Sequence, residues 1–186
     1  APTTAATTDR STVGAIRSAG TRLAQIHGVQ IANSTAGVTS SGVVFICDRL
    51  SHQGGLVANI ATTQTTNLPT AALPRYTSGD GVWIGLEVYT VLGATEVTAT
   101  VSYTNQAGTS GRTGTCRIGG GTRGANQYLG VVALQAGDTG ARSVESVTLS
   151  ITTGAAGNFG VTLFRPIVPF PFMGGANSET LFPTGI

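Results

Sequence analysis

Hydrophobic and polar residues alternate most regularly between Gly81 and Thr104. One set of alternate positions is apolar and the other mixes aromatic, charged and small residues; the first holds Val82, Ile84, Leu86, Val88 and Leu92, and the second holds Trp83, Gly85, Glu87, Tyr89 and Val91. The alternation resumes at residues 96–103 after a short break that contains Gly93. Period-two patterning rich in β-branched and aromatic residues predicts half-buried strands. Because a short gap with a glycine is typical of a hairpin, we expect residues 81–104 to form a central β-hairpin.

Further strand signals occur along the chain, at residues 29–31, 56–60, 128–134, 144–152 and 158–164. Residues 43–46 are continuously apolar, which predicts a strand that is either buried on both faces or part of an interface. Residues 105–124 contain seven glycines and are expected to form a loop. Charged residues are only 10% of the chain and glycine occurs 27 times. The sequence therefore predicts an all-β fold, a β-sandwich or jelly-roll, in which short strands are joined by turns.

The two ends of the chain differ from this central part. Residues 11–27 carry apolar side chains at spacings of three and four, which predicts a short amphipathic helix, although Gly14 and Gly20 leave an extended arm as the alternative. Residues 165–186 contain four prolines among large apolar residues and predict an extended arm that lies along a neighbouring surface, or else across the chain's own domain. We expect an N-terminal arm at 1–30, a sandwich domain at 31–164 and a C-terminal arm at 165–186.

The charge of the chain excludes several partner classes. All ten basic residues are arginine and the formal net charge is +2, which is too small for a non-specific nucleic-acid-binding surface. No apolar stretch is long enough for a transmembrane helix, and the first residues lack a secretory signal pattern. The N-terminal segment carries Arg10, Arg17 and Arg22, which could dock on an acidic surface or simply be solvated.

The candidate reactive residues do not form a recognised catalytic or metal-binding motif. Ser51 and His52 lie near Asp48, but adjacent side chains on a strand point to opposite faces, so a catalytic triad is not expected. Two cysteines and two histidines are too few for an evident metal site, and no phosphate-binding or other cofactor motif is present. Cys47 is expected to be buried and Cys116 exposed, with two free thiols favoured over a disulfide.

Four residues near the predicted hairpin are candidates for ligand binding. Glu87 and Glu96 could form a carboxylate pair of the kind that glycosidases use, although surface pairing with arginine is favoured. Trp83 and Tyr89 share a predicted face with Glu87 and could bind a sugar. Aromatic residues beside arginine are also typical anchors of protein interfaces, and we favour that interpretation.

Three segments resemble virion structural proteins of tailed bacteriophages, namely Asp48–Leu56 (DRLSHQGGL), Asn67–Val82 (NLPTAALPRYTSGDGV) and Val101–Thr113 (VSYTNQAGTSGRT). Within that group the chain is most similar to minor capsid proteins of the decoration or cement type. The resemblance covers the middle half of the chain. It implies a β-sandwich or jelly-roll that assembles as a trimer on the surface of an icosahedral capsid, after synthesis in the host cytoplasm, and that clamps neighbouring major capsid subunits. It implies no catalytic residue.

These observations together predict a non-enzymatic structural protein. Its expected partners are other copies of the chain, with a trimer favoured, and the major capsid protein of a virion. The residues expected at these interfaces come from the two arms and the hairpin: Arg10, Arg17, Arg22, Trp83, Tyr89, Phe170, Phe172, Leu181 and Phe182. A carbohydrate- or receptor-binding sandwich that uses Trp83 and Tyr89 is the alternative, and a hydrolase that uses Glu87 and Glu96 is a weaker one.

Overall fold

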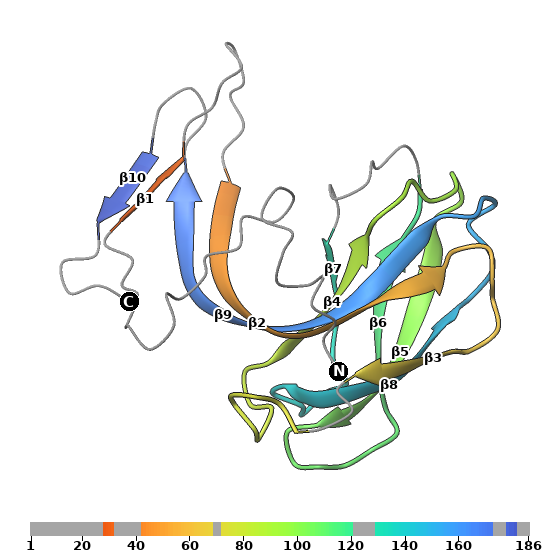
Figure 1. The fold of residues 1–186 in the computed structure, drawn as a ribbon, viewed down its shortest axis with the longest axis horizontal. Helices are drawn as coiled ribbons and strands as arrows, with labels where there is room; N and C mark the ends of the chain where they lie inside the picture. The colour runs from red at the N-terminus through yellow and green to blue at the C-terminus, as the bar shows by residue number, and fades with distance from the viewer. Residues whose placement is uncertain (1–27, 32–41, 69–71, 121–128, 173–177, 182–186) are drawn as a thin grey trace, which may run out of the picture. The chain divides into compact units, whose positions relative to one another are not determined.

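The computed structural model describes residues 28–31, 42–68, 72–120, 129–172 and 178–181 (Figure 1). These residues form β-strands and no helix. The strands are β1 (Gly28–Ile31), β2 (Gly42–Val57), β3 (Gln64–Leu68), β4 (Trp83–Val88), β5 (Val97–Asn105), β6 (Arg112–Ile118), β7 (Leu129–Val131), β8 (Ala141–Leu149), β9 (Asn158–Phe172) and β10 (Ser178–Leu181). The predicted helix at 11–27 lies outside the described residues.

Strands β2 to β9 form two four-stranded antiparallel sheets that pack as a β-sandwich. The strand order is β2-β9-β4-β7 in the first sheet and β3-β8-β5-β6 in the second. The pairs β2·β9, β3·β8, β4·β7 and β5·β6 are nested, as in one long hairpin folded over on itself. This nesting is the strand order of a jelly-roll, so the predicted fold class is confirmed.

The predicted hairpin at 81–104 is wrong, although both of its strands exist. Strand β4 pairs with β9 and β7, whereas β5 pairs with β6 and β8 in the opposite sheet. Residues 89–96 therefore cross from one sheet to the other. Gly93 is buried in this crossing, where a Cβ atom would lie 1.8 Å from the Thr153 carbonyl oxygen. The glycine is required by this close backbone approach and does not form a tight turn.

The loop predicted at residues 105–124 is wrong for residues 112–118, which form β6, whereas residues 106–111 lie outside the strands as expected. The glycine that weakens the strand signal, Gly114, has a packing reason. A Cβ atom at this position would lie 2.7 Å from the Val132 side chain and from the Ala133 carbonyl oxygen. Hydrogen bonds between Thr115 and Ala133 at this place join the β6 edge of one sheet to the chain beyond β7 of the other.

The core lies between the two sheets and is filled by the inward-facing alternate positions. Ile84, Leu86 and Val88 of β4 are at most 1% exposed, as predicted from the alternation. They face inward together with Val97, Ala99, Val101 and Tyr103 of β5 and with Phe159, Val161 and Leu163 of β9. Burial of these side chains, at about 25 cal/mol per Å² of apolar surface, is the main force that holds the sheets together.

The chain divides into two compact units. Of the described residues, the first unit contains 48–165, with the sandwich, and the second contains 28–31, 42–47, 166–172 and 178–181. In the second unit β1 pairs antiparallel with β10, with Gly28 opposite Leu181. Strands β2 and β9 contribute to both units. The segment predicted as an extended C-terminal arm thus continues β9 to Phe172 and includes β10.

Candidate interaction surface

An apolar patch lies on the outer face of the first sheet. The β4·β9 register places Trp83 beside Phe164, and the β4·β7 register places Val131 beside Gly85 and Leu129 beside Glu87. The rings of Trp83 and Phe164 meet edge to face with centroids 6.1 Å apart. Trp83, Leu129 and Val131 are 37%, 45% and 47% exposed. We call Trp83, Leu129, Val131 and Phe164 the Trp83 patch.

Gly85 explains how this patch is packed. A Cβ atom at Gly85 would lie 2.6 Å from Leu129 Cδ1 and 2.9 Å from Phe164 Cε1, so these two side chains fill the space that the glycine leaves. The exposed part of the patch thus lies on β4 and β7, and Phe164 of β9, only 5% exposed, packs against Trp83. Exposed apolar surface of this kind commonly marks a site where another molecule binds.

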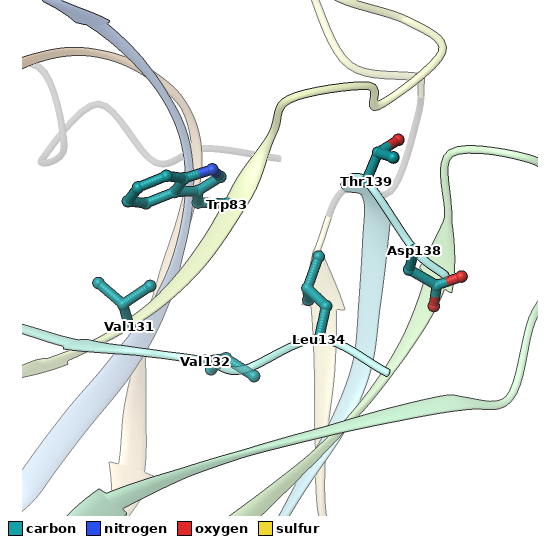
Figure 2. Close-up of a pocket in the computed structure, with 6 residues that line it drawn as sticks. All are labelled: Trp83, Val131, Val132, Leu134, Asp138 and Thr139. Atoms are coloured by element: carbon teal, nitrogen blue, oxygen red, sulfur yellow. The ribbon is translucent and has the colours of Figure 1, made fainter. Parts of the chain in front are cut away.

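A shallow hollow of about 290 Å³ adjoins the patch (Figure 2). Trp83, Val131, Val132 and Leu134 form its apolar lining, and Asp138 and Thr139 add polar groups. Both polar groups are engaged, because Asp138 binds Arg112 and the Thr139 hydroxyl donates to the Asp80 carboxylate at 2.5 Å. The hollow thus offers mainly apolar contact to a partner.

A cluster of polar side chains occupies the same outer face farther along the strands. It contains Arg49 and His52 from β2, Glu87 from β4, Tyr89 just beyond β4 and Thr162 from β9. Arg49 Nη2 donates to Glu87 Oε2 at 2.6 Å and lies 2.8 Å from His52 Nδ1. Tyr89 OH lies 2.9 Å from His52 Nε2 and donates to Glu87 Oε2 at 3.1 Å. Thr162 donates to Glu87 Oε1 at 2.9 Å. We call these five residues the His52 cluster.

The electrostatics of the cluster favour a neutral imidazole and a protonated phenol. Burial and then the Arg49 charge lower the pKa of His52 below its ordinary 6.5, and Glu87 partly opposes them. Burial and the neighbouring Glu87 carboxylate raise the pKa of Tyr89 well above 10. A tyrosine held in its protonated form is not an activated nucleophile. The cluster contains one arginine cation and one carboxylate that compensate each other.

The structure does not bring Asp48, Ser51 and His52 together. Ser51 is buried, and its hydroxyl has no hydrogen-bond partner in the part of the chain that the structure describes. Asp48 instead binds Arg75 through both carboxylate oxygens, at 2.5 and 2.7 Å. His52 joins the outer cluster together with Arg49, and the buried Ser51 hydroxyl makes no hydrogen bond to it.

The two glutamates of the predicted carboxylate pair are also separated. Glu87 lies in the His52 cluster on the outer face of the first sheet, whereas Glu96 pairs with Arg117 beside β5 and β6 of the second sheet. Packed sheets lie about 10 Å apart, and the side chains on their outer faces are farther apart still. This separation exceeds the spacing of about 5 to 9.5 Å that glycosidase carboxylates require.

Trp83 and Tyr89 lie on the same outer face, as predicted, but they do not form a pair. Six residues of extended chain separate them, which is about 20 Å at roughly 3.3 Å per residue. Trp83 contacts Phe164, whereas the Tyr89 ring meets His52 with centroids 5.6 Å apart. The two aromatic residues therefore belong to different sites.

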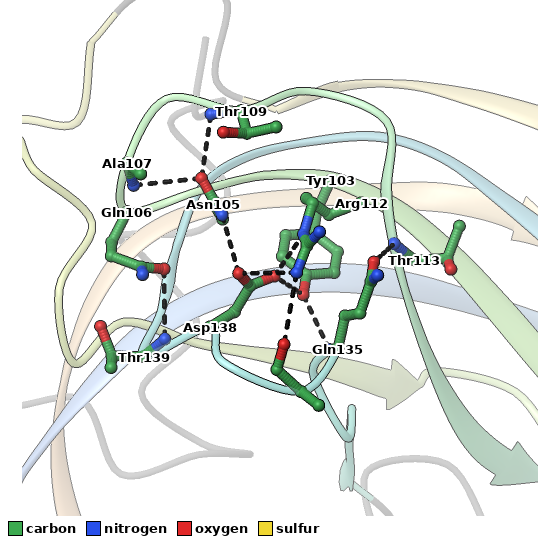
Figure 3. Close-up of polar contacts among 11 residues, drawn as sticks. Tyr103, Asn105, Gln106, Ala107, Thr109, Arg112, Thr113, Gln135, Asp138 and Thr139 are labelled. Atoms are coloured by element: carbon green, nitrogen blue, oxygen red, sulfur yellow. Dashed lines mark hydrogen bonds and ion pairs between the residues drawn. The ribbon is translucent and has the colours of Figure 1, made fainter.

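Asp138 forms a second polar network, which the sequence did not predict (Figure 3). Its carboxylate, only 3% exposed, accepts hydrogen bonds from Arg112 Nε, Tyr103 OH and Asn105 Nδ2, at 2.9, 2.5 and 2.7 Å. The Arg112 hydrogen bond, helped by those from Tyr103 and Asn105, lowers the pKa of Asp138 to about 2. The network ties β5, β6 and the turn before β8 together, and its role is structural. No local pattern points to this network, because the partners of Asp138 are 26 to 35 residues away along the chain.

The other predicted interface residues are only partly described. Arg10, Arg17, Arg22 and Phe182 lie outside the described residues, and only the backbone is described at Phe170, Phe172 and Leu181, which lie on β9 and β10. Three exposed apolar residues of the second unit were not singled out individually: Val43, Phe45 and Ile167 are 53%, 48% and 46% exposed. The apolar run at 43–46 is thus not buried on both faces.

Both described cysteines are free thiols, as favoured. Their environments are the reverse of the prediction. Cys47 is exposed, whereas Cys116 packs against the core, and burial raises its pKa to about 12. Cys116 lies opposite Ala99 on the inward-facing side of β5·β6, which its glycine-rich sequence surroundings concealed.

Within the described ranges, no group of three His, Cys, Asp or Glu side chains is arranged to hold a metal ion. The same residues include no helix long and apolar enough to cross a membrane. Comparison of the chain with protein-family models, curated proteins and solved structures finds no match.

Proposed function

We propose that the protein is a non-enzymatic structural subunit of a virion, which associates with copies of itself as a trimer and binds neighbouring major capsid subunits as a decoration or cement protein. The jelly-roll supports the proposal, because double-sheet jelly-rolls are common in viral capsid proteins, although lectins also use them. The sequence resemblance to decoration proteins of tailed bacteriophages supplies the virion setting. The charged groups of the two polar clusters pair within the chain, although Arg49 Nε is buried without a hydrogen-bond partner among the described residues.

The second unit carries the proposal. Its sequence, residues 15–47 and 166–186, contains only three charged residues, Arg17, Arg22 and Glu179. Burial is described in this unit at residues 43, 45–47 and 166–169; none of these belongs to the buried core cluster, and Val43, Phe45 and Ile167 are each about half exposed. A charge-poor unit with exposed apolar side chains has little to keep it soluble alone. Contact with other protein subunits would bury that surface.

The Trp83 patch gives the first unit a contact surface of its own. Trp is among the residues that contribute most to protein interfaces, especially where it sits in a well-packed apolar surrounding. A subunit with two separate apolar surfaces can bind two different neighbours, as a protein in a lattice must. Trimer formation and capsid binding would then use different parts of the same chain.

Light scattering on the purified full chain tests self-association. We expect a mass three times the 18.7 kDa of the chain, and dissociation when Phe45→Ser removes an exposed apolar group of the second unit. Ile151→Ser is the matched control, because Ile151 is also exposed (55%) but lies in the first unit, outside the Trp83 patch. A monomeric native chain would contradict the proposal.

Co-sedimentation with empty shells of a tailed-phage major capsid protein tests the virion assignment separately. We expect the native chain to sediment with the shells. A chain that forms trimers but binds no shell would retain the assembly part of the proposal and overturn the virion part.

A carbohydrate-binding module is the second candidate function, and one observation favours it. Trp83 lies beside a hollow, and an exposed aromatic ring at a hollow can stack on a sugar. Tyr89 is too far away to share that sugar. Glycan-array binding that disappears in Trp83→Ala and persists in Tyr89→Phe would favour this function over the structural one.

A further inference from the structure

The His52 cluster contains two basic groups that can both bind Glu87. Arg49 Nη2 lies 2.6 Å from Glu87 Oε2, and His52 Nδ1 lies 3.7 Å from the same oxygen. Both basic residues come from β2, whereas Glu87 belongs to β4. The Arg49 side chain is 29% exposed and that of His52 is 13% exposed, so Arg49 has the more direct route to water.

The hydrogen bonds determine where the imidazole proton lies. Arginine can only donate, and Arg49 Nη2 has two hydrogens for three neighbours: Glu87 Oε2 at 2.6 Å, His52 Nδ1 at 2.8 Å and Thr162 Oγ1 at 3.1 Å. The two nearest are Glu87 and His52, so we assign Nδ1 as an acceptor. With this assignment Nε2 carries the proton and lies 2.9 Å from Tyr89 OH, which is also 3.2 Å from Nδ1, and Tyr89 donates to Glu87. Thr162 also donates to Glu87.

Protonation of His52 breaks this arrangement at one atom. The added proton would sit on Nδ1 and face a guanidinium N–H, so two donors would meet across 2.8 Å. The new N–H has other acceptors nearby, because Thr162 Oγ1 is 2.9 Å from Nδ1 and Glu87 Oε2 is 3.7 Å away. Among the residues that the structure describes, the charged groups around the imidazole are Arg49 from β2 and Glu87 from β4, and Tyr89 is the remaining titratable neighbour.

We propose that the His52 cluster is a proton-driven switch, in which protonated His52 takes Glu87 from Arg49 and the Arg49 guanidinium moves into solvent on the outer face of the sheet. The cluster changes from a compensated pair to a net charge of +1. This change occurs on the same face as the Trp83 patch. The inference concerns the cluster alone and does not depend on the proposed virion function.

The direction of the pH dependence follows from the cluster's preference for neutral His52. Because the pKa of His52 is lowered in the folded chain, the unfolded chain binds the proton more readily. Stability contributed by this group is therefore present above pH 6.5 and is lost as the pH falls from 6.5 through the folded pKa. Arg49 is displaced over the same pH range.

Nitrogen NMR of the full chain, with labelled histidine and arginine, tests the switch directly. At pH 7.5 we expect His52 to be neutral with its proton on Nε2. On acidification, the Arg49 side-chain signals should change with the same midpoint as the His52 ring, and Arg49 N–H exchange with water should accelerate. A proton on Nδ1 at pH 7.5, or Arg49 signals that do not follow His52, would overturn the proposal.

Two matched variants separate this switch from general acid effects. His52→Gln keeps a neutral polar side chain that cannot be protonated, so the acid response of Arg49 should disappear. His27→Gln removes the only other histidine in the chain and should leave the response unchanged. The same Arg49 response in His52→Gln as in the native chain would contradict the proposal, and if His52→Gln does not fold, the titration of the native chain decides alone.

Discussion

The two outer faces of the sandwich have the same strand geometry but opposite surface chemistry. The face of β3-β8-β5-β6 is covered by short hydroxyl side chains, in rows that run across the strands: Thr98, Thr100, Ser102, Thr113, Thr115, Ser146 and Thr148. The face of β2-β9-β4-β7 carries the Trp83 patch and the His52 cluster. Threonine favours strands and is easily hydrated, so the face of β3-β8-β5-β6, the hydroxyl face, needs no partner. We infer that, of the two outer faces, only the face of β2-β9-β4-β7 is suited to contact with a partner.

The tightness of side-chain packing also differs between the two faces. On the hydroxyl face, neighbours such as Thr100 and Thr115 meet through small side chains that water can replace. On the other face, glycines at 85 and 160 are needed so that large side chains can lie flat across the strands. The comparison predicts that substitutions will be tolerated on one face and costly on the other.

Gly160→Ala should have the largest effect. A Cβ atom there would lie 2.4 Å from the Gln53 carbonyl oxygen and 2.7 Å from Tyr89 OH, so β2 would have to move away from β9. We expect a loss of about 3 kcal/mol in the free energy of unfolding, measured by urea denaturation. A loss below about 0.5 kcal/mol would show that this face is not tightly packed.

Removal of a carboxylate charge should have the next largest effect on stability, and this effect should differ between the two faces. Glu87→Gln weakens the partly buried pair with Arg49 and should cost about 1 to 2 kcal/mol in unfolding free energy. Glu96→Gln is the matched control, because its pair with Arg117 is 47% and 70% exposed, and it should cost less than about 0.5 kcal/mol. Equal losses in the two variants would remove the distinction between the faces.

Two nearly isosteric substitutions in opposite directions should have the smallest effect on stability. Val131→Thr adds a hydroxyl to the Trp83 patch, and Thr100→Val removes one from the other face. Each should change the unfolding free energy by less than about 0.5 kcal/mol, because both side chains are exposed. Only Val131→Thr should weaken co-sedimentation with shells of the major capsid protein. If only Thr100→Val weakened this binding, the interface would lie on the hydroxyl face of β3-β8-β5-β6, and the prediction would be wrong.

The sequence predicted where the strands lie and which side chains face the core better than it predicted which strands pair. Alternation correctly placed Ile84 and Leu86 inside and Trp83 and Glu87 outside, because strand periodicity is a local property. The pairing of β4 with β9 depends on contacts more than 70 residues apart, to which no local pattern points. The glycine gap at Gly93 therefore looked like a hairpin when it is a crossing between sheets.

The sequence identified several residues of the His52 cluster but not which of them contact one another. His52, Glu87 and Tyr89 were all singled out, but with Ser51, Glu96 and Trp83 as their partners. Their actual neighbours, Arg49 and Thr162, come from β2 and β9, and no sequence spacing connects them. The exposure of Val43, Phe45 and Ile167 likewise depends on where β2 and β9 run, which hydrophobicity alone does not determine.

Hydroxyl-radical footprinting of the chain in its assembled and dissociated forms reports the exposure of each side chain, and so shows whether Phe45 and Trp83 lie in subunit interfaces. The account predicts that Phe45 and Trp83 lose reactivity on assembly, while Ile151, which is exposed in the single chain, stays equally reactive. Equal labelling of Phe45 and Trp83 in both forms would contradict it.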